Sequence, residues 1–395
     1  MDRHQPLPRD DHYDAIVVGA RCAGAATAML LAREGFDVVV VDRADLPSDT
    51  LSTHSIARGG VVQLSRWGLL DDVLASGAPP IRQVSFHFPS GEALVKAIKD
   101  KAGVDHLLAP RRQVLDDILL REAIDSGVSV QTGVSVTATL TDSSGRVTGV
   151  ALRDRDGRAR ELHARLVVGA DGVRSRIARS VGARVLEQGP PGGWLAYTYV
   201  ERSDWEGFEF HLGDRSFAGL FPTHDGEANV WACGPGTMPR GQDFVELLRA
   251  TSPSLAARVE GGRITAPVRS ASGLPNHLLD SAGPGWALVG DAGYHRDPIT
   301  GHGITDAFRD AELLARHAAQ ALNGERPEDD ALRAYATERR RLLAPIFEVT
   351  CRLAQYPPLE EFIELQKHLS TLIDAEAAWL ADLPPVPPAR RVVAA

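Results

Sequence analysis

Apolar and polar positions along this chain alternate in a way that predicts strands separated by helices. Residues 14–18 form a short apolar run, residues 25–34 are rich in helix formers, and residues 36–41 form a second apolar run. Glycine-bearing turns separate the runs. Short, nearly continuous apolar runs are typical of parallel strands buried on both faces. The first 42 residues therefore predict a strand–turn–helix–strand unit.

Further helical and strand patterns follow along the chain, and two segments with the pattern of an antiparallel sheet interrupt them. Residues 55–76 and 111–125 have helical spacing, whereas residues 81–99 alternate like strands around a turn at Pro89, Ser90 and Gly91. Strand patterns follow around 128–137, 147–152 and 166–169. Residues 184–272 resemble an antiparallel sheet with alternating aromatic residues, and a final apolar strand at 286–290 precedes a long helix over 303–323.

These patterns predict an α/β protein in which a Rossmann-like domain is interleaved with an antiparallel β-sheet domain and followed by C-terminal helices. The Rossmann-like domain is expected to bind a dinucleotide and the antiparallel domain to face the substrate. The predicted segments of the Rossmann-like domain are 1–77, 110–183 and 276–328, those of the antiparallel domain are 78–109 and 184–275, and the C-terminal helical region and tail are 329–395.

Composition narrows the class of protein. The chain of 395 residues has a net charge of −9 and no long Lys/Arg block, which argues against a nucleic-acid partner. Residues 1–12 lack the apolar core of a signal peptide, and no run approaches the roughly 18 apolar residues of a membrane span. The three cysteines fit neither a disulfide framework nor a common zinc motif. We therefore expect a cytoplasmic enzyme without stable membrane insertion and without a bound metal.

The first chemical motif lies in the turn between the first strand and helix. It reads Gly19-Ala20-Arg21-Cys22-Ala23-Gly24, with Arg21 in place of the central glycine of a dinucleotide fingerprint, and Asp42 closes the next strand. Glycines let the backbone approach a pyrophosphate, the helix N-terminus attracts anions, and the acid accepts ribose hydroxyls. A glycine turn between any strand and helix is the alternative, but it does not account for the acid.

Two further glycine-bearing turns follow apolar strands. One is Gly169-Ala170-Asp171-Gly172-Val173-Arg174-Ser175, and the other runs from Val289-Gly290-Asp291 through His295, Asp297 and Pro298 to Gly301-His302-Gly303-Ile304. With the first motif, these residues make the chain resemble the flavoprotein monooxygenases typified by p-hydroxybenzoate hydroxylase, together with the related geranylgeranyl reductases and flavin halogenases. The resemblance spans residues 13 to 330 and implies one FAD, with NAD(P)H as reductant.

The resemblance also implies roles for individual positions. Asp42 and Arg43 would bind the adenosine ribose, the backbone at Val136 would meet adenine, and Arg112 and Asp291 would reach the phosphates or ribityl chain. The amides at Gly303 and Ile304 would face the flavin, where a helix N-terminus stabilises the negative charge of the reduced ring. The complete set of predicted cofactor-binding residues is Gly19, Arg21, Ala23, Gly24, Asp42, Arg43, Arg112, Val136, Asp171, Asp291, Pro298, Gly301, Gly303 and Ile304.

Three polar residues are candidates for a catalytic role. His295 and Asp297 lie where members of the resembled family approach the flavin, and His54 follows the first unit where the chain would pass the ring. Each is able to move a proton or orient a phenol. The alternative is that each is a hydrogen-bonding turn residue. Likewise, the aromatic residues between 194 and 231 either line a substrate pocket or form sheet core.

The predicted function is an FAD-dependent monooxygenase that uses NAD(P)H and O2 to hydroxylate an aromatic or polycyclic small molecule. The first alternative is a reductase of the geranylgeranyl type, because Phe217 to Pro222 resembles the strand motif of those enzymes. A halogenase is disfavoured, since the chain has no Trp-x-Trp-x-x-Pro run and no lysine before residue 96. A non-catalytic flavin-binding protein is the alternative from another class.

Overall fold

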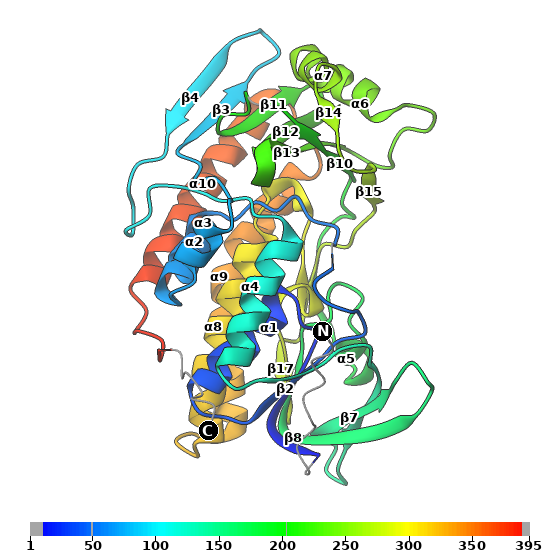
Figure 1. Ribbon diagram of the computed structural model, residues 1–395, viewed down its shortest axis with the longest axis vertical. Helices are drawn as coiled ribbons and strands as arrows, with labels where there is room; N and C mark the ends of the chain where they lie inside the picture. Colours follow the sequence, from blue (N-terminus) through cyan, green and yellow to red (C-terminus); the bar gives the residue numbers. More distant parts are fainter. Residues whose placement is uncertain (1–10, 49, 203, 389–395) are drawn as a thin grey trace.

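Two large β-sheets and a layer of long helices make up the computed structural model, which describes residues 11–48, 50–202 and 204–388 (Figure 1). The first sheet lies in the lower half of Figure 1 and the second in the upper half. The sheets come from interleaved parts of the chain, and the helices α8, α9 and α10 pack beside them.

The first sheet has a parallel core with the strand order β17-β18-β8-β1-β2-β5. The edge strand β17 is antiparallel, and a hairpin of β6 and β7 pairs with the first half of the long strand β8. The strands are β1 (His12–Val18), β2 (Val38–Val41), β5 (Ser129–Gln131), β6 (Ser135–Thr141), β7 (Val147–Arg153), β8 (Ala159–Gly169), β17 (Ala282–Gly283) and β18 (Trp286–Leu288).

Alternate residues of β1 divide between two cores. Ala15 and Val17 pack with α1 (Cys22–Arg33), α4 (Arg112–Asp125) and α8 (Gly303–Leu322). Ile16 and Val18 face the other way, toward the β6–β7 hairpin and α5 (Arg176–Ser180). Because both faces are covered, β1 and β2 have nearly continuous apolar sequences rather than alternating ones.

The second sheet has the order β14-β10-β13-β12-β11-β3-β4, and β15 also pairs with β10. All of these pairs are antiparallel except β11 with β3. Residues 83–97 thus join a sheet formed mainly by residues 194–272. The strands are β3 (Gln83–His87), β4 (Ala93–Ala97), β10 (Trp194–Glu201), β11 (Phe208–Gly213), β12 (Ser216–Pro222), β13 (Glu227–Gly234), β14 (Arg263–Ile264) and β15 (Arg269–Ser272).

Helices cover both faces of the second sheet. On one face an aromatic core lies against α10 (Leu359–Ala381) and the end of α9 (Glu328–Leu353). On the other face lie α6 (Phe244–Thr251) and α7 (Pro253–Glu260). The remaining elements are α2 (Arg58–Arg66), α3 (Leu70–Ala75), the 3-10 helices η1 (His224–Gly226), η2 (Gly290–Ala292) and η3 (Pro298–Thr300), and a small sheet of β9 (Val185–Gln188), β16 (His277–Leu279) and β19 (Tyr294–His295).

The predicted fold class, a Rossmann-like domain interleaved with an antiparallel sheet and followed by helices, is confirmed. The exact domain boundaries stay a prediction from the sequence. The prediction of an antiparallel sheet over 184–272 did not include α6 and α7, although both have start signals. Asp243 and Glu246 form a capping box, and the Ser252 side chain caps a helix that has Pro253 at its first position.

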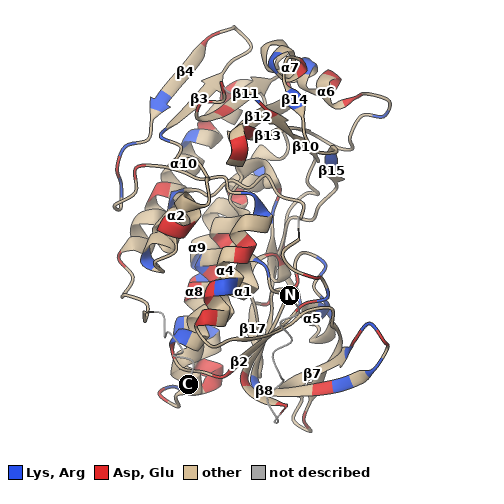
Figure 2. Cartoon of the chain, viewed as in Figure 1, with Lys and Arg blue, Asp and Glu red and all other residues tan. Residues whose placement is uncertain are grey.

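Acidic and basic residues are interspersed along α8, α9 and α10 (Figure 2). Several of the charges on α8 are buried. Asp310, Arg309 and Asp306 are 0 %, 0 % and 3 % exposed, so each requires a partner within the protein. Among the described residues, none of the helices combines the length and apolar content that a bilayer crossing requires.

The pair between Asp310 and Arg339 joins α8 to α9. Nε and Nη2 of Arg339 lie 2.9 and 2.6 Å from Oδ2 of Asp310, and the backbone N–H of Gly290 donates to the same oxygen at 3.0 Å. Arg309 donates to the other carboxylate oxygen at 3.0 Å. This carboxylate therefore holds the Gly290 turn against two helices.

We expect Arg339→Met to lower the free energy of unfolding by about 3–5 kcal/mol, because it leaves part of a buried charge uncompensated. The control is the neighbouring Arg340→Met, which removes an exposed ion pair with Glu187 worth about 0.2–1 kcal/mol. Urea denaturation followed by circular dichroism measures both. Equal losses in the two variants would contradict the structural importance of the buried pair.

Candidate functional site

A cavity of about 730 Å³ lies between the two domains, within the size range of small-molecule and cofactor sites. Its wall includes Val18 and Val41 at the carboxyl ends of β1 and β2, and Asp291 just after β18. Leu195 of the second sheet lines it from the opposite side. Ligands of doubly wound proteins bind at the carboxyl ends of the parallel strands, so this cavity is the candidate site.

The first glycine-bearing loop packs backbone against backbone. A Cβ on Gly24 would lie 1.7 Å from the carbonyl oxygen of Gly19, and one on Gly19 would lie 2.4 Å from that of Ala170. Gly19 also has a φ of 106°, which favours glycine. Arg21, at the N-cap of α1, makes no side-chain cap. Gly24 does not line the cavity, whereas Gly19, Arg21 and Ala23 do.

Asp42 and two neighbours form one end of the cavity. Oδ2 of Asp42 accepts a hydrogen bond from the backbone N–H of Ala20 at 2.8 Å, and Oδ1 accepts one from Ala44 at 2.8 Å. Arg43 and Val136 line the cavity beside it. The first loop is thus tied to the end of β2 through a carboxylate that also faces the cavity.

Arg112 and Arg21 both line the cavity and share Asp116 as a partner. Nη2 of Arg112 lies 3.1 and 3.2 Å from the two carboxylate oxygens, and Nη1 of Arg21 lies 3.5 Å from Oδ2. Burial opposes the charge of Arg112, but Asp116 outweighs this effect and raises the pKa of the guanidinium. Asp116 also accepts a hydrogen bond from the backbone N–H of Cys22 at 3.1 Å.

Asp116 was not among the residues predicted from the sequence to form the site. The signal for its role was present, because Arg112 and Asp116 are four residues apart in a predicted helix and therefore lie on the same face. Asp116 connects α4 to the start of α1 and orients both arginines toward the candidate site.

Asp171, in the second glycine turn, lines the cavity with a carboxylate that already has partners. It accepts hydrogen bonds from the hydroxyl of Ser175 at 2.6 Å and from the backbone N–H of Arg176 at 2.6 Å. These contacts secure the first turn of α5. A direct cofactor contact by the Asp171 side chain stays a prediction.

The third motif brings Asp291, Pro298, Gly301, Gly303 and Ile304 to the same cavity. Asp291 is accessible from the cavity, yet the surrounding protein raises the pKa of its carboxyl group, mainly through burial. Gly301 has a φ of 59° and approaches the Ser55 side chain. A Cβ on Gly303 would meet nothing within 4 Å, so the first residue of α8 faces open space.

His295 and Asp297 line the cavity, but their side chains bind the backbone of nearby loops. Nδ1 of His295 lies 2.6 Å from the carbonyl oxygen of Pro275. Asp297 accepts hydrogen bonds from the N–H groups of Ile299 at 2.9 Å and Gly193 at 3.0 Å. Burial raises the pKa of Asp297, and these two hydrogen bonds partly oppose the rise. Both residues have the contacts expected of structural turn residues.

His54 is the most unusual polar residue of the site. It is 1 % exposed, lines the cavity, and has a φ of 67°, a conformation that non-glycine residues adopt at a cost. Its Nε2 shares a hydrogen bond with the hydroxyl of Tyr199, whereas its Nδ1 has no hydrogen-bond partner among the described residues. Burial lowers the pKa of His54 well below its ordinary value, and Arg112 and Arg111 lower it further.

Tyr199 connects His54 to a partly buried charge pair. The Arg111 guanidinium lies 3.6 Å from the centre of the Tyr199 ring, and Nη1 of Arg111 donates to Glu227 at 2.6 Å. The sequence analysis treated Tyr199 only as one of the alternating aromatics and did not single out Arg111, because only the three-dimensional structure brings them to His54.

The aromatic residues between 194 and 231 form sheet core. Tyr197, Phe217, Phe221 and Trp231 are 0–4 % exposed and none of them lines the cavity. The structure therefore supports the interpretation of these four residues as sheet core and not as the lining of a substrate pocket. In contrast, all of the predicted site residues except Gly24 line this one cavity.

This geometry defines a class of protein: a dinucleotide-binding flavoprotein in which a second, antiparallel domain covers the cofactor site. The comparisons with known proteins agree. A sequence model described as FAD binding domain matches residues 12–349. The chain therefore belongs to this FAD-binding family, and it is an FAD-dependent oxidoreductase. The resemblance found in the sequence is confirmed.

Two relatives illustrate the family, and one solved structure illustrates the fold. The chain is 30% identical over 373 residues to menaquinone reductase of Mycolicibacterium smegmatis, covering 89% of this chain and 86% of that protein. It is 26% identical to digeranylgeranylglycerophospholipid reductase of Methanocella arvoryzae, covering 84% and 83%. The flavin-dependent brominase Bmp2 has a similar fold, with a TM-score of 0.78, 16% identity and coverage of 94% of each chain.

The residues of the cavity fit FAD. The close contacts of Gly19 and Gly24 leave room only for hydrogen at the first loop, as a pyrophosphate-binding turn requires. The N-cap residues of α1 and α8, Arg21 and His302, make no side-chain cap, and the positive ends of both helix dipoles lie at the cavity, where they attract the negative charges of the cofactor.

We expect Asp291→Ala to weaken FAD binding by about 1.5–3 kcal/mol, the usual value of a charge-assisted hydrogen bond, or about 10- to 150-fold in Kd. Fluorescence titration of the deflavinated protein with FAD measures the change. The matched control is Asp156→Ala in the exposed β7–β8 hairpin, which should leave the Kd unchanged. If both variants bind FAD as tightly as the original protein, Asp291 does not contact the cofactor.

Proposed function

We propose that FAD lies along the cavity with its adenosine at Asp42, Arg43 and Val136. The pyrophosphate would meet the amides of the first loop, where Gly19, Arg21 and Ala23 line the cavity, together with Arg112 and Asp291. The ring would lie beside Pro298 and the residues Gly301 to Ile304 that begin α8. This orientation places the positive end of the α8 dipole next to the negative charge of a reduced flavin.

The reaction we propose is the reduction of a carbon–carbon double bond with NAD(P)H as electron donor. Such a reaction adds a hydride to one carbon and a proton to the other. FAD, when bound, supplies the hydride transfer, and the protein must provide the proton and exclude water. The comparisons support a reductase, because the two relatives described above are named for the reduction of menaquinone and of digeranylgeranylglycerophospholipid.

The observation that carries this proposal is the unpartnered Nδ1 of buried His54. If the hydroxyl of Tyr199 donates to Nε2, the neutral imidazole holds its proton on Nδ1. A buried N–H without a partner is costly and is typical of groups that serve a ligand. His54 would then give its Nδ1 proton to the substrate while its Nε2 takes the proton of the Tyr199 hydroxyl.

The substrate we propose is an unsaturated prenyl chain carried by a quinone or a lipid. Leu51, Leu195 and Leu274 contribute apolar side chains to the cavity wall, beside polar residues such as Thr53 and Ser55. The apolar part of such a wall binds a hydrocarbon without requiring hydrogen bonds that the chain could not return.

The monooxygenase predicted from the sequence is the second candidate. It would use the same cofactor, NAD(P)H and O2 to hydroxylate an aromatic or polycyclic compound. The observation that favours it is the lowered pKa of His54, since a neutral imidazole at neutral pH is also able to accept the proton of a phenol. The two candidates differ in whether oxygen is consumed and in whether the product gains hydrogen or oxygen.

Anaerobic turnover distinguishes these functions. The purified holoprotein is reduced with NADH or NADPH and supplied with menaquinone or a geranylgeranyl-bearing lipid, and mass spectrometry follows the product. We expect a gain of hydrogen without oxygen. Oxygen uptake with an oxygenated aromatic product would establish the monooxygenase instead, and a flavin that neither nucleotide reduces would indicate a non-catalytic flavin-binding protein.

His54→Gln tests the proposed proton donor. We expect product formation to fall by about 10²- to 10⁴-fold, the usual contribution of a general acid, while FAD content and the rate of flavin reduction by NAD(P)H stay unchanged. His106→Gln is the control, because His106 is also buried but does not line the cavity. Unchanged product formation in His54→Gln would remove His54 from the reaction.

A further inference from the structure

A second group of polar side chains lies in the antiparallel domain, away from the FAD cavity. His87 of β3 and His211 of β11 are partners in the parallel register of the two strands. Glu209 lies two residues before His211, so its side chain is on the same face of the sheet. Phe210, between them, packs into the aromatic core on the opposite face. None of the three polar residues lines the cavity.

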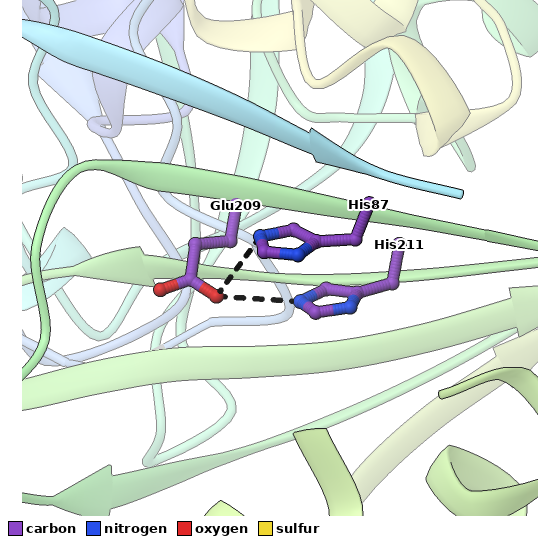
Figure 3. Close-up of side chains that lie close together, drawn as sticks. All are labelled: His87, Glu209 and His211. Carbon is purple, nitrogen blue, oxygen red and sulfur yellow. Dashed lines mark hydrogen bonds and ion pairs between the residues drawn. The ribbon is translucent and has the colours of Figure 1, made fainter. Parts of the chain in front are cut away.

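The three side chains converge on a single point (Figure 3). Nε2 of His211 lies 3.3 Å and Nε2 of His87 lies 3.7 Å from the same carboxylate oxygen of Glu209. The ligand atoms of the three residues all lie within 4.8 Å of one another. In a tetrahedral zinc site, ligand atoms are about 3.3–3.5 Å apart, given bonds of about 2.0–2.2 Å.

We propose that His87, Glu209 and His211 bind a divalent transition-metal ion of the zinc class. Two imidazoles and one carboxylate are ligands that Zn²⁺ prefers, and three protein ligands leave one position for water. The two rings are stacked with centroids 4.2 Å apart, so they must tilt toward each other to direct both nitrogens at one ion. His87 is one-third exposed and has room for this movement.

A polar contact from outside the cluster holds one of the two rings. Ser252 lies 2.9 Å from Nδ1 of His211, an outer contact that orients the ring.

Two existing hydrogen bonds must break when an ion binds. The hydroxyl of Ser85 lies 3.0 Å from Nε2 of His87, and Nη1 of Arg258 lies 2.6 Å from the oxygen of Glu209 that would bind the ion. Arg258 has room to move because its side chain is 29 % exposed, and its guanidinium also lies 4.7 Å from the Trp205 ring. Its Nη2, 3.0 Å from the other oxygen of Glu209, is placed to orient the bound carboxylate.

A second cluster in the protein has the same kinds of ligand but a different environment. His302, Asp306 and Glu376 also lie close together, but Arg309, which is fully buried, pairs with both carboxylates and has no exposed position to which it could move. Arg258 is 29 % exposed. The cluster on β3 and β11 is therefore the better candidate, and an ion there would fasten the β3–β4 hairpin to the rest of the sheet.

The test uses holoprotein stripped with a chelator and then titrated with Zn²⁺, with Co²⁺ as a spectroscopic probe at wavelengths beyond the flavin bands. We expect one ion per chain and a higher melting temperature in the presence of metal. His87→Ala and His211→Ala each remove a direct ligand. Each should therefore lower the Zn²⁺ affinity by more than roughly 100-fold, the upper end of the range for the loss of an outer-shell contact. FAD content should stay unchanged in both.

The control is His163→Ala. His163 stacks on His12 at 5.0 Å and lies 3.9 Å from Glu161, but this cluster is exposed and more open. Its loss should not change metal affinity. Failure of the original protein to bind Zn²⁺, or equal affinity in His211→Ala and His163→Ala, would overturn the proposal.

Discussion

The need to pair the buried charges of α8 fixes one side of the candidate site. Asp306, Arg309 and Asp310 are almost completely removed from solvent, where an unpaired charge is very costly. Their partners come from four different places: the Gly290 turn, Arg296 in the third motif, Arg339 of α9 and Glu376 of α10. A single helix thereby holds the loops that frame one side of the cavity.

The opposite side of the cavity depends on close backbone contact rather than on charge. The first loop, the Ala170 turn and the end of β2 approach so closely that a side-chain carbon on Gly19 or Gly24 has no space. Asp42 and Asp116 add carboxylates that accept backbone hydrogen bonds from the loop and from the first residue of α1. The two halves of the site are thus preorganised by different means, and His54 lies between them in a strained conformation.

The sequence predicted the parts of this site that local pattern determines. Gly19 and Gly301 have backbone conformations that favour glycine, Gly24 has no room for a side chain, and Asp42 follows directly after a strand, so this information is contained within a few positions. The pairing of Tyr199 with His54, or of Arg111 with the Tyr199 ring, joins segments that are far apart along the chain. No local pattern reports such contacts. The helices α6 and α7 were missed for another reason, because the alternating aromatics around them dominated the interpretation.

The interleaving of the two domains has a consequence for how the protein is made. Strand β18 pairs with β8, although the strands β10 to β15 of the antiparallel domain separate them along the chain. During synthesis, the parallel sheet therefore keeps an open edge until the ribosome has released residues beyond Leu288. Pairings over such long sequence separations form slowly, and exposed edges invite aggregation in the meantime. Production of this protein should thus depend more on chaperones and on slow, cool expression than its modest size suggests.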